Sequence, residues 1–79
     1  MLEKILTTFE EEEILILDEF DSAVIGIDTN SMRLIYSIEK IIEILKTHMS
    51  RFDAFEYFEF NILNAYVGEK TPIFCDDNF

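Results

Sequence analysis

The most reactive side chains of this 79-residue sequence are a single histidine, His48, and a single cysteine, Cys75. A lone histidine with no cysteine or second histidine nearby is a weak metal ligand or general base, so we assign His48 a structural or surface role. A lone cysteine cannot form an internal disulfide, and the apolar neighbours of Cys75 predict a buried thiol in a strand. Neither residue indicates a catalytic centre.

The 17 acidic residues show no spacing that selects a pair for acid-base catalysis. Four consecutive glutamates, residues 10–13, diverge on a helix or a strand and do not converge on one metal ion. Residues 28–31, DTNS, resemble the beginning of a calcium loop, but Met32 and Arg33 stand where a ligand and a glycine are required. The sequence therefore predicts no metal, no cofactor and no catalytic residues, and we expect a protein that is not an enzyme.

The segment AYVGEKTPIF, residues 65–74, combines the only proline with one of two glycines. A phosphate-binding loop of the Walker type needs two glycines and a lysine directly after the second one, and this segment has neither. Gly68 suits a turn position with positive φ, and Pro72 suits the beginning of a strand, where its missing N–H costs least. We predict a structural turn that leads into a last strand.

The first half of the chain predicts a helix, a strand and a hairpin. Leu2, Ile5, Leu6 and Phe9 form a helical stripe over residues 2–11, which the acidic run should end because carboxylates oppose the dipole at a helix C-terminus. A strand is expected at 14–17, ILIL, and a hairpin at 22–28 and 33–37 with its turn at 29–32. Gly26 inside the hairpin indicates a bulge or a close approach by another element.

The second half predicts two helices and a last strand at 71–75. Ser37 is the expected N-cap of the first helix, and Ser50 caps the second, with Asp53 in the capping-box position. Tyr57 and Phe60 project from the opposite side of the second helix to its apolar stripe and, three residues apart, can touch. The apolar stripes are Ile38, Ile41, Ile42, Leu45 and Met49 in the first helix, and Phe55, Phe58, Ile62 and Ala65 in the second, with Phe52 and Leu63 at its margin.

This order predicts an α+β fold: one small domain with a mainly antiparallel sheet of three to four strands and two to three helices packed on one face. Within the single domain 1–79, we distinguish an acidic N-terminal helix and strand (1–19), a core of hairpin, two helices and last strand (20–75), and a tail (76–79).

The formal charge of −11 predicts repulsion from nucleic-acid phosphates and anionic membranes, so we expect neither as a direct partner. The start has no signal-peptide pattern, and no apolar run approaches the ~20 residues that span a bilayer. With one cysteine, the chain is expected to be soluble and cytoplasmic. The acidic surface either keeps the protein solvated or docks on a basic protein.

Two groups of residues are candidates for protein interaction. Residues 1–21 hold eight acids against Lys4, a local balance of −7. Tyr57 and Phe60 have three alternatives: burial within the chain, contact with a second copy, or contact with a foreign partner. The candidate residues are Tyr57, Phe60, Glu10, Glu11, Glu12, Glu13, Asp18, Glu19 and Asp21.

Two phrases, FDSAVIGIDTNSMRLIYSIEKIIEIL (20–45) and DAFEYFEFNILNAYVGEKTPIF (53–74), resemble small uncharacterised proteins of tailed bacteriophages, including cyanophages. The resemblance covers about two thirds of the chain and leaves out the first 19 residues. It implies a phage origin and a cytoplasmic setting in the infected cell, and it carries over no functional residues.

In that setting we expect a small acidic accessory protein that binds and modulates another protein, such as a basic host protein, without catalysis. The alternatives are a homo-oligomeric structural protein, a DNA mimic and an unrecognised enzyme.

Overall fold

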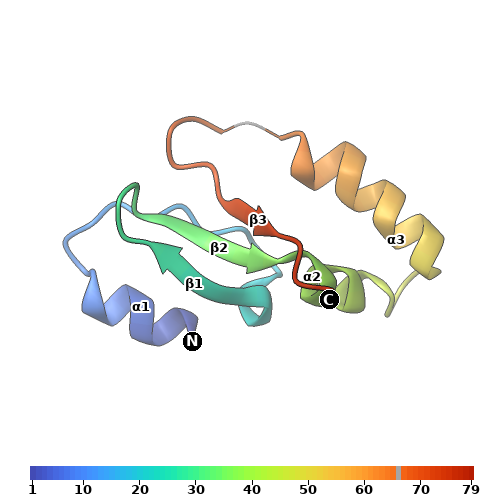
Figure 1. Ribbon diagram of the computed structural model, residues 1–79, viewed down its shortest axis with the longest axis horizontal. Coiled ribbons are helices and arrows are strands. Elements are labelled where there is room, and N and C mark those ends of the chain that lie inside the picture. The colour runs from blue at the N-terminus through green and yellow to red at the C-terminus, as the bar shows by residue number, and fades with distance from the viewer. Residues whose placement is uncertain (66) are drawn as a thin grey trace.

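A computed structural model describes residues 1–65 and 67–79, so Tyr66 in the predicted AYVGEKTPIF turn lies outside the described residues. Figure 1 shows a twisted sheet with α1 near one end of the long axis and α3 near the other. In chain order the elements are α1 (Leu2–Thr8), the 3₁₀ helix η1 (Asp21–Ala23), β1 (Val24–Asp28), β2 (Arg33–Ser37), α2 (Ile38–Leu45), α3 (Arg51–Tyr57), the π-helical segment η2 (Phe58–Leu63) and β3 (Ile73–Cys75).

The three strands form one mixed sheet in the order β1-β2-β3. β1 and β2 are antiparallel, with Asp28 opposite Arg33 beside the turn, whereas β3 runs parallel to β2. A parallel neighbour requires a long crossover connection, which α2 and α3 supply here. The α+β prediction with a mostly antiparallel sheet is confirmed.

The hairpin contains a β-bulge where Gly26 predicted an irregularity. Val24 pairs with Tyr36 and Gly26 pairs with Ile35, so Ile25 is the additional residue on β1. A Cβ atom built on Gly26 would meet nothing within 4 Å. The bulge is therefore confirmed, and a close approach by another element is excluded.

The core lies between the sheet and α2. Leu34 and Tyr36 from β2 and Ile41 and Ile42 from α2 are fully buried. The helix begins where predicted, because the Ser37 hydroxyl accepts a hydrogen bond from Lys40 N at 3.1 Å. The remaining core side chains come from α1, the segment before η1, η1, β1, α2, α3 and η2; they are Leu2, Ile5, Phe20, Ala23, Val24, Leu45, Ala54, Phe58 and Ile62.

The N-terminal quarter differs from the prediction in two ways. α1 ends at Thr8, short of residue 11, so the four glutamates follow the helix in a turn. The predicted strand at 14–17 is wrong: Ile14 and Leu17 are half-buried while Leu15 and Ile16 are exposed, a spacing of three that does not suit the two-residue period of a strand. The segment instead meets the sheet through Leu17 N, which donates to Tyr36 Oη at 2.8 Å.

The last helix continues further than α3 itself. Ser50 caps it by accepting from Asp53 N at 3.1 Å, as predicted. Its last six residues are π-helical, and Asn64 Nδ2 donates to Glu59 O, five residues back, at 2.7 Å. Because the helix ends before Ala65, that residue is exposed, and its predicted place in the apolar stripe is wrong. None of the helices in residues 1–65 and 67–79 is long and apolar enough to cross a membrane.

The described part of AYVGEKTPIF is a turn, as predicted. Gly68 has φ of 106°, and its carbonyl accepts from Thr71 N at 3.2 Å and from Thr71 Oγ1 at 2.6 Å. Pro72 is buried directly before β3. Lys70 Nζ donates to Ser31 O at 2.9 Å and thereby joins this turn to the β1–β2 turn. Lys70 therefore has a structural role, because its ammonium group holds the two turns together.

Candidate functional site

Tyr57 and Phe60 lie exposed on the α3–η2 helix. Their exposed fractions are 44% and 73%, so burial within the chain, one of the three alternatives, is excluded. The aromatic ring pairs recorded in the described residues are Tyr36–Phe74 and Phe58–Phe74, so Tyr57 and Phe60 do not form the predicted ring contact. The two side chains present separate apolar surfaces from one helix.

The eight acids of residues 1–21 are exposed. The two ion pairs within residues 1–65 and 67–79, Lys46–Glu43 and Arg51–Glu39, include none of them. In Figure 1, α1 and the acidic turn after it lie far along the long axis from α3. The structure therefore does not bring Glu10 to Glu13 and the aromatic residues of α3–η2 into one site. The exposed acids are Glu3, Glu10, Glu11, Glu12, Glu13, Asp18, Glu19 and Asp21.

His48 and Cys75, the two most reactive side chains, do not belong to a group of potential metal ligands in the described residues. His48 is exposed in the turn after α2, and Cys75 is half-buried in β3, where we had expected a buried thiol. Because β3 is an edge strand only three residues long, it leaves this side chain partly open. Within residues 1–65 and 67–79, no three His, Cys, Asp or Glu side chains gather as metal ligands would.

Asp28, the first residue of the rejected calcium-like segment, organises the β1–β2 turn. Its carboxylate accepts from Asn30 N at 3.0 Å and from Ser31 Oγ at 2.8 Å. The hydrogen bond from Asn30, followed by that from Ser31, holds the pKa of this carboxyl below its ordinary value. Asp28 is therefore engaged within its own turn.

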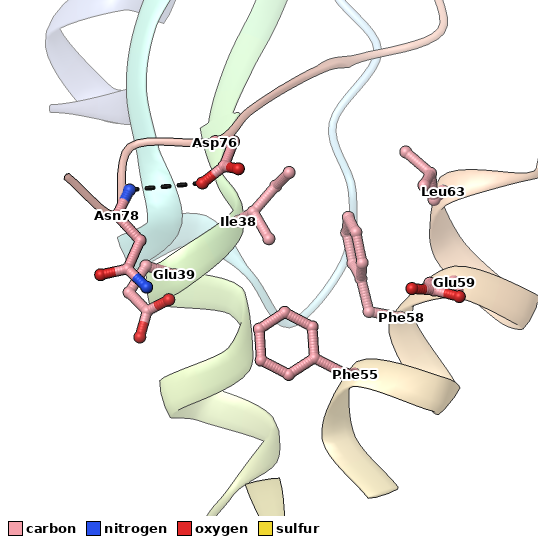
Figure 2. Close-up of a pocket in the computed structure, with 8 residues that line it drawn as sticks. All are labelled: Ile38, Glu39, Phe55, Phe58, Glu59, Leu63, Asp76 and Asn78. Atoms are coloured by element: carbon pink, nitrogen blue, oxygen red, sulfur yellow. Dashed lines mark hydrogen bonds between the residues drawn. The ribbon is translucent and has the colours of Figure 1, made fainter. Parts of the chain in front are cut away.

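A groove that sequence reasoning missed lies between α2, the α3–η2 helix and the C-terminal tail. It has a volume of about 300 Å³, near the lower limit of roughly 300 Å³ for small-molecule pockets. Figure 2 shows the Phe55 and Phe58 rings between Glu39 and Asp76 on one side and Glu59 on the other. The full lining is Ile38, Glu39, Phe55, Phe58, Glu59, Leu63, Asp76 and Asn78. We call it the phenyl–carboxylate groove.

Buried contacts hold both walls of the phenyl–carboxylate groove. Phe58 is 2% exposed and meets the Phe74 ring edge to face, with centroids 5.4 Å apart. On the opposite wall, the buried Ser37 hydroxyl donates to Asp77 Oδ1 at 2.8 Å and so ties the tail to the beginning of α2. Asn78 N in turn donates to Asp76 Oδ1 at 3.3 Å, the dashed line in Figure 2. The tail is thus part of the groove.

Arg51 shows how a guanidinium binds at the rim of the phenyl–carboxylate groove. Its Nη2 lies 2.9 Å from Glu39 Oε1. Its Cζ lies 5.0 Å from the centroid of the Phe55 ring, within the range of a cation–π contact. One carboxylate and one ring of the groove therefore already bind an arginine of the same chain.

The helical spacing predicts Phe55 and Phe58 in the apolar stripe of the second helix, and the structure confirms it: Phe58 is in the buried core and Phe55 packs against that core. The sequence does not predict that the tail forms a wall of the groove, because the Ser37–Asp77 hydrogen bond joins residues 40 positions apart. A second, more apolar groove of about 350 Å³ involves segments equally distant in sequence: Leu15 to Asp18, Ile62 and Phe74 contribute to it.

No protein-family model, curated protein or solved structure matches this chain.

Proposed function

We propose that this chain is a small, non-catalytic, acidic accessory protein of a tailed bacteriophage that binds and modulates a basic protein of the host cell. The observation that carries the proposal is the exposure of Phe60, at 73%, beside Tyr57 on an ordered helix. Aromatic side chains are enriched at protein interfaces and often provide most of the binding energy there.

The charge of the chain supports a basic partner. A net charge of −11 repels a second copy and attracts a cationic surface. The exposed acids of residues 1–21, remote from the aromatic side chains, suit long-range steering, which raises the association rate more than the affinity. The phage origin rests on the resemblance of residues 20–45 and 53–74 to tailed-phage proteins.

Affinity capture from a lysate of the host bacterium tests this proposal, with the parent chain and two variants as baits. Phe60→Glu places a charge on the proposed contact, and Phe79→Glu is the control, since Phe79 is also an exposed phenylalanine but lies in the tail. We expect the parent and Phe79→Glu to retain one basic protein at low salt, and Phe60→Glu to retain at least about tenfold less, the loss of one anchor residue.

Circular dichroism should show that both variants fold like the parent, because both side chains are exposed. Recovery should fall as salt screens the charges. Equal recovery by Phe60→Glu, or no basic protein on the parent at low salt, would count against the proposal.

A homo-oligomer is the second candidate, since the same exposure of Tyr57 and Phe60 suits contact with a second copy. Light scattering separates the two: a parent that is oligomeric, with Phe60→Glu monomeric and folded, supports the oligomer. A monomeric parent supports the foreign partner.

DNA mimicry is weaker on geometric grounds. Duplex DNA carries one charge per ~1.7 Å of its axis, so a duplex as long as the 39 Å long axis of this protein carries roughly 23 negative charges. The chain has 17 acids in total. Failure to displace DNA from the captured partner would remove this alternative.

A further inference from the structure

We propose that the phenyl–carboxylate groove binds an arginine side chain of the partner protein. This inference rests on the proposed function, because it names the chemistry by which the partner is recognised. A guanidinium suits the groove better than an ammonium, since it is planar, stacks on phenyl rings and pairs with carboxylates through two N–H groups at once.

The carboxylates of the groove lie on both sides of its apolar floor. Glu59 projects from η2 and Asp76 from the tail, with the Phe58 ring between the two elements (Figure 2). Both are exposed, and neither belongs to an ion pair in the part of the chain that the structure describes. An entering cation therefore meets charge on two sides and aromatic carbon beneath.

Arg51 provides an internal precedent for this chemistry. It contacts Glu39 and the Phe55 ring at one end of the groove. At the other end Glu59 and Asp76 supply carboxylates, and Phe58, at 2% exposure, closes the apolar floor between them. The groove thus holds one arginine site that is occupied by its own chain, and two further carboxylates that form no ion pair in the part of the chain that the structure describes.

The occupant comes from a different protein, because a second copy of this chain has no arginine to offer. The sequence contains two arginines, Arg33 and Arg51. Arg33 is half-buried and donates through Nε to Thr71 O, and Arg51 is paired with Glu39. Charge complementarity also favours a cationic partner over another chain of charge −11.

The test is a titration of the isotopically labelled protein with the blocked tripeptide Ala-Arg-Ala, followed by NMR. The control is the same peptide with citrulline, a neutral isostere of arginine. We expect the arginine peptide to shift the amide signals of Ile38, Phe58, Glu59 and Asp76, and the citrulline peptide to leave them in place. Equal shifts with both peptides, or arginine-dependent shifts centred on residues 10–13, would overturn the inference.

Two matched double variants show whether binding of the arginine peptide needs the carboxylates of the groove or only the overall negative charge. Glu59→Gln/Asp76→Asn should lower the affinity for the arginine peptide roughly two- to fivefold per carboxylate removed, which is the range measured for exposed ion pairs. Glu12→Gln/Glu13→Gln removes the same charge at exposed positions outside the groove and should change the affinity by less than about twofold, because salt screens remote charges. Equal weakening by both pairs would show a general charge effect and contradict the groove.

Capture of the partner separates this inference from the proposed function. A partner that the parent and Glu59→Gln/Asp76→Asn retain equally well would refute the arginine site and leave the protein-binding role intact. If the parent retains no partner, the protein-binding role fails, and the peptide titration still decides whether the groove takes arginine.

Discussion

The two ends of the molecule are both acidic and both expose apolar side chains, but their backbones differ. From residue 9 to residue 20 the N-terminal end has no regular helix or strand, and the hydrogen bond from Leu17 N to Tyr36 Oη connects it to the sheet. The other end is a capped helix that buries Ala54, Phe58 and Ile62. Charge is therefore shared by both ends, whereas the candidate acids at positions 10–19 lie on irregular backbone and Tyr57 and Phe60 lie on a capped helix.

This difference suggests separate contributions to binding. Charges act over about 10 Å at ordinary salt and do not need exact positions. Stacking and paired hydrogen bonds need atoms held in place. We therefore expect the N-terminal acids to affect the rate of association and the α3–η2 helix to affect the lifetime of the complex.

The largest expected effect is the loss of the anchor that holds α3–η2 to the sheet. Phe58 is 2% exposed and packs on Phe74, so Phe58→Ala should lower the free energy of unfolding by about 3–5 kcal/mol. Urea unfolding followed by far-ultraviolet circular dichroism measures the change.

Phe60→Ala is the matched control on the same helix. At 73% exposure this side chain should change the free energy of unfolding by less than about 0.5 kcal/mol. A similar loss in both variants would mean that the helix is not anchored as described, and the contrast between the two ends would fail.

How far the sequence predicts this molecule depends on whether a signal is local. The bounds of β2, the Ser37 and Ser50 caps, the Gly26 bulge and the positive φ of Gly68 all follow from short-range rules, and the structure confirms each. Such features depend on neighbours within a few residues, and those neighbours are visible in the sequence.

Two of the failures involve contacts between residues that are distant in sequence, the segment at 14–17 and the C-terminal tail. The apolar run at 14–17 has the composition of a strand, yet its bond to Tyr36 spans 19 positions and its backbone pairs with no strand of the described sheet. The π-helical geometry of η2 and the wall that the tail adds to the phenyl–carboxylate groove were likewise unpredicted. Among the candidate site residues, helical spacing placed Tyr57 and Phe60 opposite the apolar stripe but left burial within the chain open, and it gave no sign of the groove.

The next effect in size concerns Ser37, which has two hydrogen bonds: one from Lys40 N and one to Asp77 Oδ1. Ser37→Ala removes an N-cap and the tail contact together, so we expect a loss of about 1–2 kcal/mol in the free energy of unfolding. Ser50→Ala removes an exposed cap alone and should cost about 0.5–1 kcal/mol.

Asp77→Ala isolates the tail contact and should shift the NMR signals of Asp76 and Asn78 while α2 stays capped. The tail is not a fixed wall of the groove if two results are found together. These are a loss of unfolding free energy no larger in Ser37→Ala than in Ser50→Ala, and unchanged NMR signals of Asp76 and Asn78 in Asp77→Ala.

Apart from the control variants Phe60→Ala and Ser50→Ala, the smallest expected effect is at the N-terminal end, where Tyr36→Phe removes the acceptor of the Leu17 N–H. The loss should be about 1 kcal/mol, the net value of one hydrogen bond. Hydrogen exchange at Leu17 should become faster, while exchange in α3 stays unchanged. Faster exchange in α3 as well would mean that the two ends are not independent.

The same variant carries a pH signature. Burial, which is the largest cause, raises the pKa of the Tyr36 hydroxyl above its ordinary value of 10.0; the hydrogen bond from Leu17 N opposes this shift, and the charges of Asp21 and Asp18 add to it. The folded chain therefore keeps this proton at pH values where the unfolded chain releases it, so the associated stability is complete below pH 10.0 and is lost as the pH rises above it. Unfolding of the parent and of Tyr36→Phe measured from pH 8 upward should show a steeper decline for the parent, because the other tyrosines are common to both. Parallel declines would show that burial does not raise the pKa of the Tyr36 hydroxyl.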